Sequence, residues 1–241
     1  DRDIRHIYLK YLLKVENTFK SVLAHEFSAL YGHYNYLKLE NFDAVPDNIS
    51  SIIKLFGDIQ QETARQMSKH HQAVTHYLSE YGYIPLWVLV NVLTFGKVTM
   101  FYKLMKPQDK QNIARKFHVD AKELHKYMSL CGLARNQCAH DERFFDLKFR
   151  WHLHTRSVAN FSCLGLERDK SGSYPSGTND VYAIGIVFAR LLGTADTAEF
   201  IASMSAAFSK LEQQLHTISI KDVMRIMGYP AAWERLQQLA R

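Results

Sequence analysis

The amino-acid sequence predicts a mostly α-helical protein, and three observations carry this prediction. Only 11 glycines and 5 prolines occur in 241 residues, which is few for a turn-rich β fold. Apolar residues recur at steps of three and four over long stretches, which is the period of an amphipathic helix. With 47% hydrophobic and 22% charged residues, the composition is that of a globular protein. The length suits one large domain, or one domain with an elaboration, around a sizeable core.

The first third of the chain predicts two long helical regions. Residues 3–31 place apolar side chains at helical spacing, and Gly32 is a suitable stop. Residues 33–45 are aromatic and irregular, so we expect a loop on the surface. A second helical region then runs from about residue 46 to residue 81, with a break expected near Gly57.

The middle of the chain predicts a core helix and then a shorter one. Pro85 stands where a helix tolerates proline, and residues 86–95 are apolar nearly all round, so this helix is expected at the centre of the core. Gly96 would let another helix approach closely. Residues 107–117 predict a short helix, and Asp120 is placed to cap the next one.

The pattern changes after residue 145, where apolar and basic residues alternate. This period of two predicts a short β or extended arm near 146–164 with one basic face. Two interpretations stay open: a ridge that contacts RNA, or a strand packed on the helices with a solvated polar face. The apolar residues are Leu147, Phe149, Trp151 and Leu153, and the basic ones are Lys148, Arg150, His152 and His154.

The remaining residues predict an exposed loop at 165–180 and a helical C-terminal part. Ser219 and Asp222 have the spacing of a capping box, and Gly228 with Pro230 predicts a stop. The helices are expected at about 180–192, 196–215, 219–227 and 230–240.

Charge and cysteine content restrict the classes of partner. The net charge of +6 and the pI near 9.1 favour a polyanion such as RNA. Three cysteines without a C-x-x-C pair indicate reduced thiols in a cytoplasmic protein, without a disulfide framework or zinc site. We expect no metal and no cofactor. The longest apolar run is too short to span a bilayer, so no membrane association is expected.

The segment from Arg135 to Phe145 carries the strongest chemical signal. Histidine titrates close to neutral pH, so His140 can move a proton. The guanidinium of Arg135 suits a phosphate oxygen that gains charge during transfer. Asn136 can orient the histidine or the substrate without adding charge. These three residue types in this order are a compact set for cutting RNA.

The position of Arg135 strengthens the signal and raises a geometric problem. Leu124, Met128 and Cys131 precede it at helical spacing, so Arg135 falls on a face that should be buried and needs a partner or a ligand there. A core arginine that caps or pairs with the next element is the structural alternative. In a straight helix Arg135 and His140 would lie about 140° apart. The helix should therefore distort or end between them, or two copies of the motif should assemble one site.

The segment resembles the R-N-x-x-A-H signature of HEPN-type ribonucleases, and the chain as a whole resembles the Abi-like family of bacterial abortive-infection proteins (the AbiD/AbiF group). The resemblance spans most of the chain in the family's order. It implies a HEPN-type helical bundle over residues 1–145 and a helical extension over 146–241. Because the first block begins at residue 1, we expect a native N-terminal segment to precede it. The matching blocks are Asp1 to Arg5 with Glu16 and Phe27, Pro85 to Trp87 with Leu93 to Lys97, Ala134 to Phe144, and Met227 to Pro230 with Trp233.

The resemblance implies a metal-independent endoribonuclease toxin, active as a homodimer in phage defence and restrained by a bound RNA or a protein antitoxin. The alternatives are a non-cleaving protein that holds a structured noncoding RNA with the same motif, and a regulator that binds only proteins. The expected catalytic residues are Arg135, Asn136 and His140. Arg143 is assigned to substrate binding or to holding the motif, and Lys148, Arg150 and His152 to RNA binding.

Overall fold

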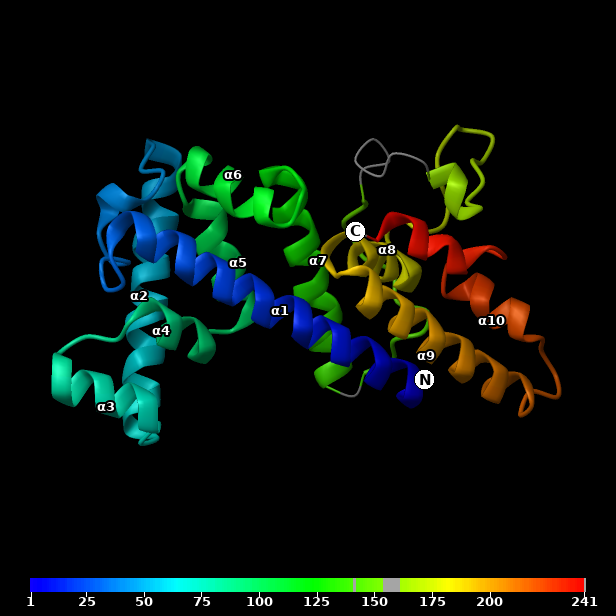
Figure 1. The fold of residues 1–241 in the computed structure, drawn as a ribbon, viewed down its shortest axis with the longest axis horizontal. Coiled ribbons are helices and arrows are strands. Elements are labelled where there is room, and N and C mark those ends of the chain that lie inside the picture. Colours follow the sequence, from blue (N-terminus) through cyan, green and yellow to red (C-terminus); the bar gives the residue numbers. More distant parts are fainter. Residues whose placement is uncertain (141, 154–160, 241) are drawn as a thin grey trace. The chain divides into compact units, whose positions relative to one another are not determined.

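The computed structural model describes residues 1–140, 142–153 and 161–240, and helices dominate them (Figure 1). The described residues form no sheet, only one isolated bridge between Phe42 and Met105. The all-α prediction is confirmed. The α-helices are α1 (Arg2–Tyr31), α2 (Pro46–Ser68), α3 (Gln72–Tyr81), α4 (Leu86–Val92), α5 (Phe95–Leu104), α6 (Pro107–Lys116), α7 (Ala121–Ala139), α8 (Val181–Leu191), α9 (Thr194–Glu212) and α10 (Ile220–Ile226). Short 3₁₀ helices are η1 (Leu39–Asn41), η2 (Phe161–Leu164) and η3 (Trp233–Leu239).

The chain packs into two compact units. One unit holds residues 1–15 and 130–241, and the other holds residues 16–129. The long helices α1 and α7 each contribute one part to either unit. The N-terminal half of α1 therefore packs with the C-terminal part of the chain. The division expected from the sequence at residues 145 and 146 concerns the family core and its extension, and it stays a prediction.

The unit formed by residues 16–129 has an aromatic core between α1 and α5. Phe19 lies against Tyr102, with ring centroids 5.5 Å apart, and Phe27 lies against Phe101 at 5.1 Å. All four rings are buried. The helix expected at the centre, residues 86–95, is instead the short α4, which ends before a new helix starts at Phe95.

Two further expectations for this unit are wrong, and a third is wrong in part. A Cβ on Gly96 would meet nothing within 4 Å, so no helix approaches it closely. Gly57 lies inside α2, since glycine permits a break without compelling one, and the chain breaks near His70, which has a φ of 53°. The loop after α1 lies on the surface only in part, because Tyr36 and Phe42 are buried whereas Tyr34, Leu39 and Val45 are exposed.

In the unit formed by residues 1–15 and 130–241, the first half of α1 runs antiparallel to α9 (Figure 1). Ion pairs between oppositely charged side chains join the two helices. Lys10 pairs with Glu199 at 2.6 Å, and Asp3 pairs with Lys210 at 2.9 Å nearer the opposite end of α9. Exposed ion pairs contribute little stability, about 0–1 kcal/mol each, so they mainly set the register. Beneath them Tyr8 and Tyr11 each contact the ring of Phe200 at 5.3 Å.

A buried carboxylate organises the start of α8. Asp180 is fully buried and accepts backbone N–H groups from Ala183 at 3.1 Å and Gly177 at 2.9 Å. The ammonium of Lys148 donates to the same carboxylate at 3.3 Å. The backbone of Gly228 also passes directly over this carboxylate, with no room for a side chain. Asp180 thus joins the segment before α8, the arm after α7 and the C-terminal helices.

The arm after residue 146 forms no strand in its described part and bends at residues 150 and 151. Phe149 and Leu153 donate backbone N–H groups to the Asn179 and Thr178 carbonyls, both at 2.7 Å, and are buried. These two hydrogen bonds do not make a ladder. Trp151, expected on the same apolar face, is 61% exposed, so the alternation is wrong at that residue. His154 lies outside the described residues.

The C-terminal part follows the predicted pattern with two exceptions. The loop at 165–180, expected to be exposed, is buried at its end, where Gly177, Thr178 and Asp180 lie in the interior. Ser219 and Asp222 form the expected capping box at the start of α10. Gly228 follows α10 with a φ of 85°, which suits a glycine stop. The segment from Trp233 is a 3₁₀ helix rather than an α-helix, and Trp233 and Leu236 anchor it in the core.

Candidate functional site

The motif occupies the C-terminal end of α7. The helix begins as predicted, because the Asp120 carboxylate accepts the N–H of Glu123 at 2.8 Å. The apolar stripe is also confirmed, since Leu124, Met128 and Cys131 are fully buried. Arg135 continues that stripe and is half-buried.

The helix ends between Arg135 and His140 without prior distortion. It runs to Ala139, and the His140 N–H still donates to the Asn136 carbonyl at 3.0 Å, which is a regular helical bond. Five such steps leave Arg135 and His140 about 140° apart around the axis. Asn136 and His140, four steps apart, share one flank, and both are exposed. Within one chain, the histidine therefore neighbours the asparagine rather than the arginine.

The N-terminus of the chain fastens the segment that follows the motif. Arg5 is buried, and its guanidinium donates to the Glu142 carbonyl at 2.8 Å. The Asp1 carboxylate accepts the backbone N–H of Phe145 at 2.9 Å and pairs with Arg5 at 3.4 Å. Arg5 and Asp1 are therefore positioning residues for the end of α7. The sequence assigned them no role, although both stand in the first family block and that block could have drawn attention to them.

A buried aromatic cluster supports the same segment from below. Phe144 is fully buried, and its ring lies 5.0 Å from that of Tyr8. The Tyr8 hydroxyl donates to the Val181 carbonyl at 3.1 Å and is hydrogen-bonded to the hydroxyl of Tyr229. Burial raises the pKa of both Tyr8 and Tyr229 well above the usual value of a tyrosine. Both hydroxyls therefore stay protonated. The C-terminal helices thus help to hold the end of α7.

Cys138 has the properties of a structural residue rather than a nucleophile. It is buried, and burial raises the pKa of its thiol to about 12 despite the opposing charge of Arg5. At neutral pH the thiol is protonated and unreactive.

Most of the side chains expected to bind RNA already have partners within the chain. Arg143 pairs with Asp146 and lies over the ring of Phe145. Lys148 is held by Asp180, and His152 lies within hydrogen-bond distance of Thr178 and Asn179. Arg150 is exposed and makes no hydrogen bond or ion pair to the described part of the chain. The assignment of these four residues to RNA binding stays a prediction.

Neither a metal site nor a membrane-spanning helix is found in the part of the chain that the structure describes. Among residues 1–140, 142–153 and 161–240, no three histidine, cysteine or acidic side chains are grouped so that they could hold a metal ion. No helix in those same ranges combines the length and the apolar character that crossing a membrane would require.

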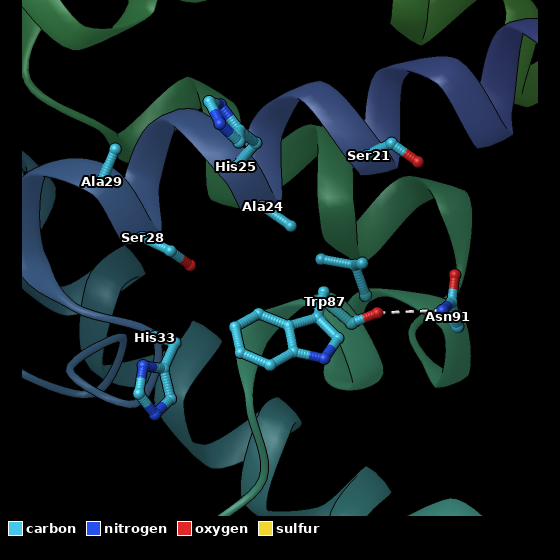
Figure 2. A pocket seen from close by; sticks show the side chains of 9 residues that line it. Ser21, Ala24, His25, Ser28, Ala29, His33, Trp87 and Asn91 are labelled. Atoms are coloured by element: carbon cyan, nitrogen blue, oxygen red, sulfur yellow. Dashed lines mark hydrogen bonds between the residues drawn. The ribbon is translucent and has the colours of Figure 1, made fainter.

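In the unit formed by residues 16–129, a groove of about 430 Å³ lies between α1 and α4 (Figure 2). Figure 2 shows the indole of Trp87 facing Ala24 and Ser28 across it, with the Asn91 amide bonded to the Trp87 carbonyl at 2.9 Å. Trp87 is 48% exposed, which accounts for the failure of the core-helix prediction at this position. None of the motif residues lines this groove.

These features define an all-α protein with an Arg-Asn-x-x-Ala-His segment fastened to its own N-terminus. The family model described as "Abi-like protein" matches residues 1–146, which is more than half of the chain. The chain therefore belongs to the Abi-like family, which is associated with abortive infection in phage defence. No curated protein and no solved structure matches it.

Proposed function

We propose that this protein is a HEPN-type, metal-independent endoribonuclease that acts in phage defence by abortive infection. The observation that carries the proposal is the end of α7, where Asn136 and His140 share an exposed flank on a segment anchored by Arg5. A solvent-facing histidine held this way can reach a substrate. The family membership supports the biological context.

In the proposed reaction the ribose 2′-oxygen attacks the adjacent phosphorus, and the bond from phosphorus to the 5′-oxygen breaks. His140 takes the proton from the 2′-hydroxyl as general base while water gives a proton to the leaving 5′-oxygen, or His140 gives that proton as general acid while water takes the 2′-hydroxyl proton. Arg135 stabilises the charge that develops on the phosphate oxygens. Asn136 orients the histidine or the phosphate. The products are a 2′,3′-cyclic phosphate and a 5′-hydroxyl, and no step uses a metal ion.

A labelled RNA incubated with the protein in EDTA should be cleaved to products with these two ends. The 3′ end of the upstream fragment should be a cyclic phosphate, which acid opens and which resists alkaline phosphatase until it is opened. Mass spectrometry of the fragments identifies it. A 3′-hydroxyl product, or cleavage that requires added metal, would contradict the mechanism. RNA bound for hours without product would favour the RNA-holding alternative instead.

The geometry of α7 favours a site built from two chains. Because Arg135 and His140 point about 140° apart in one helix, we assign Arg135 of one chain to work with His140 of the partner subunit. A two-fold dimer would then contain two equivalent sites.

Mixing two inactive variants should test this arrangement. Arg135→Ala and His140→Ala are each expected to be inactive, whereas an equimolar mixture after exchange of subunits should recover about a quarter of the wild-type activity. Half of the randomly formed dimers pair the two variants, and each such dimer has one intact site of two. Cleavage of labelled RNA before and after mixing is the measurement. Failure to recover activity, with exchange demonstrated by light scattering and tagged subunits, would exclude this composite site.

Such a nuclease needs restraint in the cell. The net charge of +6 favours a structured RNA as the restraining partner, and a protein antitoxin is the alternative. We propose the cytoplasm as the site of action, since that is where the substrate RNA is present.

A further inference from the structure

A pocket in the unit formed by residues 16–129 is lined almost entirely by basic side chains. Its volume is about 290 Å³, at the small end of the roughly 300–1,000 Å³ typical of ligand sites. It lies where α5, α6 and the start of α7 meet. The lining residues are Lys103, Lys110, Ala121, Lys122, His125 and Lys126.

A buried hydroxyl holds the three helices that form this pocket. Tyr102 of α5 is fully buried, and its hydroxyl lies 3.0 Å from the Lys110 carbonyl and 3.3 Å from the Ala121 carbonyl. The Gln111 side chain of α6 accepts the Ala121 N–H at 3.2 Å. The four lysines that line the pocket therefore stand on helices whose backbones are tied together.

Some lysines in the described part of the chain are ion-paired, and the lysines of the pocket are not among them. Lys10, Lys97 and Lys116, for example, each lie within 4 Å of a carboxylate. Across the residues that the structure describes, no carboxylate lies within ion-pair distance of a lysine in the pocket. One of them, Lys110, has its ammonium 3.0 Å from the Lys103 carbonyl. Asp43 influences Lys110 through its charge without forming an ion pair with it, so the protein offsets the positive charge of the pocket only in part.

The pocket lowers the pKa of the half-buried imidazole of His125. Burial lowers its pKa, and the nearby charges of Lys103, Lys110 and Lys126 lower it further. Burial also lowers the pKa of Lys110. The negative charge of Asp43 opposes this change, and the positive charge of Lys103 adds to it. Neutral His125, which also lines the pocket, can donate or accept a hydrogen bond there.

We propose that this pocket binds a phosphate group. A phosphate offers several acceptor oxygens to the lysines that line the pocket and reduces their mutual repulsion. The group could belong to the backbone of a polynucleotide or to a free nucleotide or phosphate ion. The site is separate from the motif at the end of α7, so its existence does not depend on RNA cleavage.

The first experiment compares a pocket variant with a matched control. The probe is a fluorescent single-stranded 2′-O-methyl RNA, which lacks the free 2′-hydroxyl needed for cleavage. Lys122→Gln with Lys126→Gln should weaken binding about tenfold at 0.1 M salt and flatten the dependence of log K on log salt concentration by about 1 to 2. Lys38→Gln with Lys69→Gln removes the same charge from exposed positions of the same unit and should change binding by less than about twofold. Because the pocket substitutions relieve repulsion, the melting temperature should not fall.

The second experiment uses the imidazole signal of His125 in nuclear magnetic resonance spectra, identified by its absence in His125→Gln. Inorganic phosphate or adenosine monophosphate that shifts this signal and raises the pKa of His125 at constant ionic strength would identify a free phosphate ligand. A shift produced only by the RNA would identify the polynucleotide backbone. Either result supports the pocket. Equal loss of binding in the pocket and control variants, or no shift with any of the three probes, would overturn it.

Discussion

His140→Ala is expected to lower RNA cleavage by about 10²- to 10⁴-fold, the range that a positioned general acid or base contributes. The side chain is exposed and follows the last residue of α7. Its removal should therefore change the free energy of unfolding by less than about 1 kcal/mol, the largest ordinary contribution of a charge at a surface helix end. Initial rates on labelled RNA and thermal unfolding followed by circular dichroism measure the two effects separately.

The matched control is His216→Ala. His216 is also exposed and belongs to the same compact unit, but it lies after α9 and far along the chain from the motif. Its replacement should leave the rate unchanged within about twofold. His140→Gln keeps the polar side chain but cannot move a proton, so it should be as inactive as the alanine variant. Wild-type rates in either His140 variant would refute the assignment of this residue.

Gly228→Ala is expected to cause the largest loss of stability among single substitutions of small residues. The residue has a φ of 85°, in the left-handed region, and a Cβ there would overlap the buried Asp180 carboxylate. Left-handed backbone costs an alanine about 1–2 kcal/mol, and overpacking a buried site adds about 1–3 kcal/mol. The sum is a large part of the roughly 5–15 kcal/mol that stabilises a typical protein. We expect a melting temperature lower by about 10 °C, or insoluble protein.

Gly172→Ala separates the two causes of this loss. Gly172 has a φ of 80° in the same compact unit, but a Cβ there would meet nothing within 4 Å. It should therefore show only the backbone cost, about 1–2 kcal/mol at most. Chemical denaturation of both variants compares the free energies of unfolding. If the two variants are destabilised equally, the close approach of Gly228 to Asp180 does not matter for stability.

The local signals in the sequence were sufficient for the helical architecture. Helical periodicity predicted α1 and the buried stripe of α7, and capping chemistry predicted the roles of Asp120 and Ser219. These features depend on residues only a few positions apart. The error at the expected core helix arose because its burial on all sides was inferred from composition alone. Residues 86–95 read as one core helix, yet Trp87 faces the groove and the chain restarts as α5 at Phe95.

The sequence was enough to propose the residues of the candidate site, but not the residues that hold the end of α7 in place. The order of Arg135, Asn136 and His140 is local, and so is the angle between them on a helix. The contact between Arg5 and the Glu142 carbonyl joins positions 137 residues apart, and no periodicity encodes it.

The sequence by itself determined that this chain is mostly helical, which family it resembles and where Arg135, Asn136 and His140 stand at the end of α7. Only the tertiary structure decided that the N-terminus fastens the end of α7, that Gly228 passes over Asp180 and that four lysines surround one pocket. The physical reason is that helix formation depends on neighbours within a few residues, whereas convergence of side chains depends on how the helices pack.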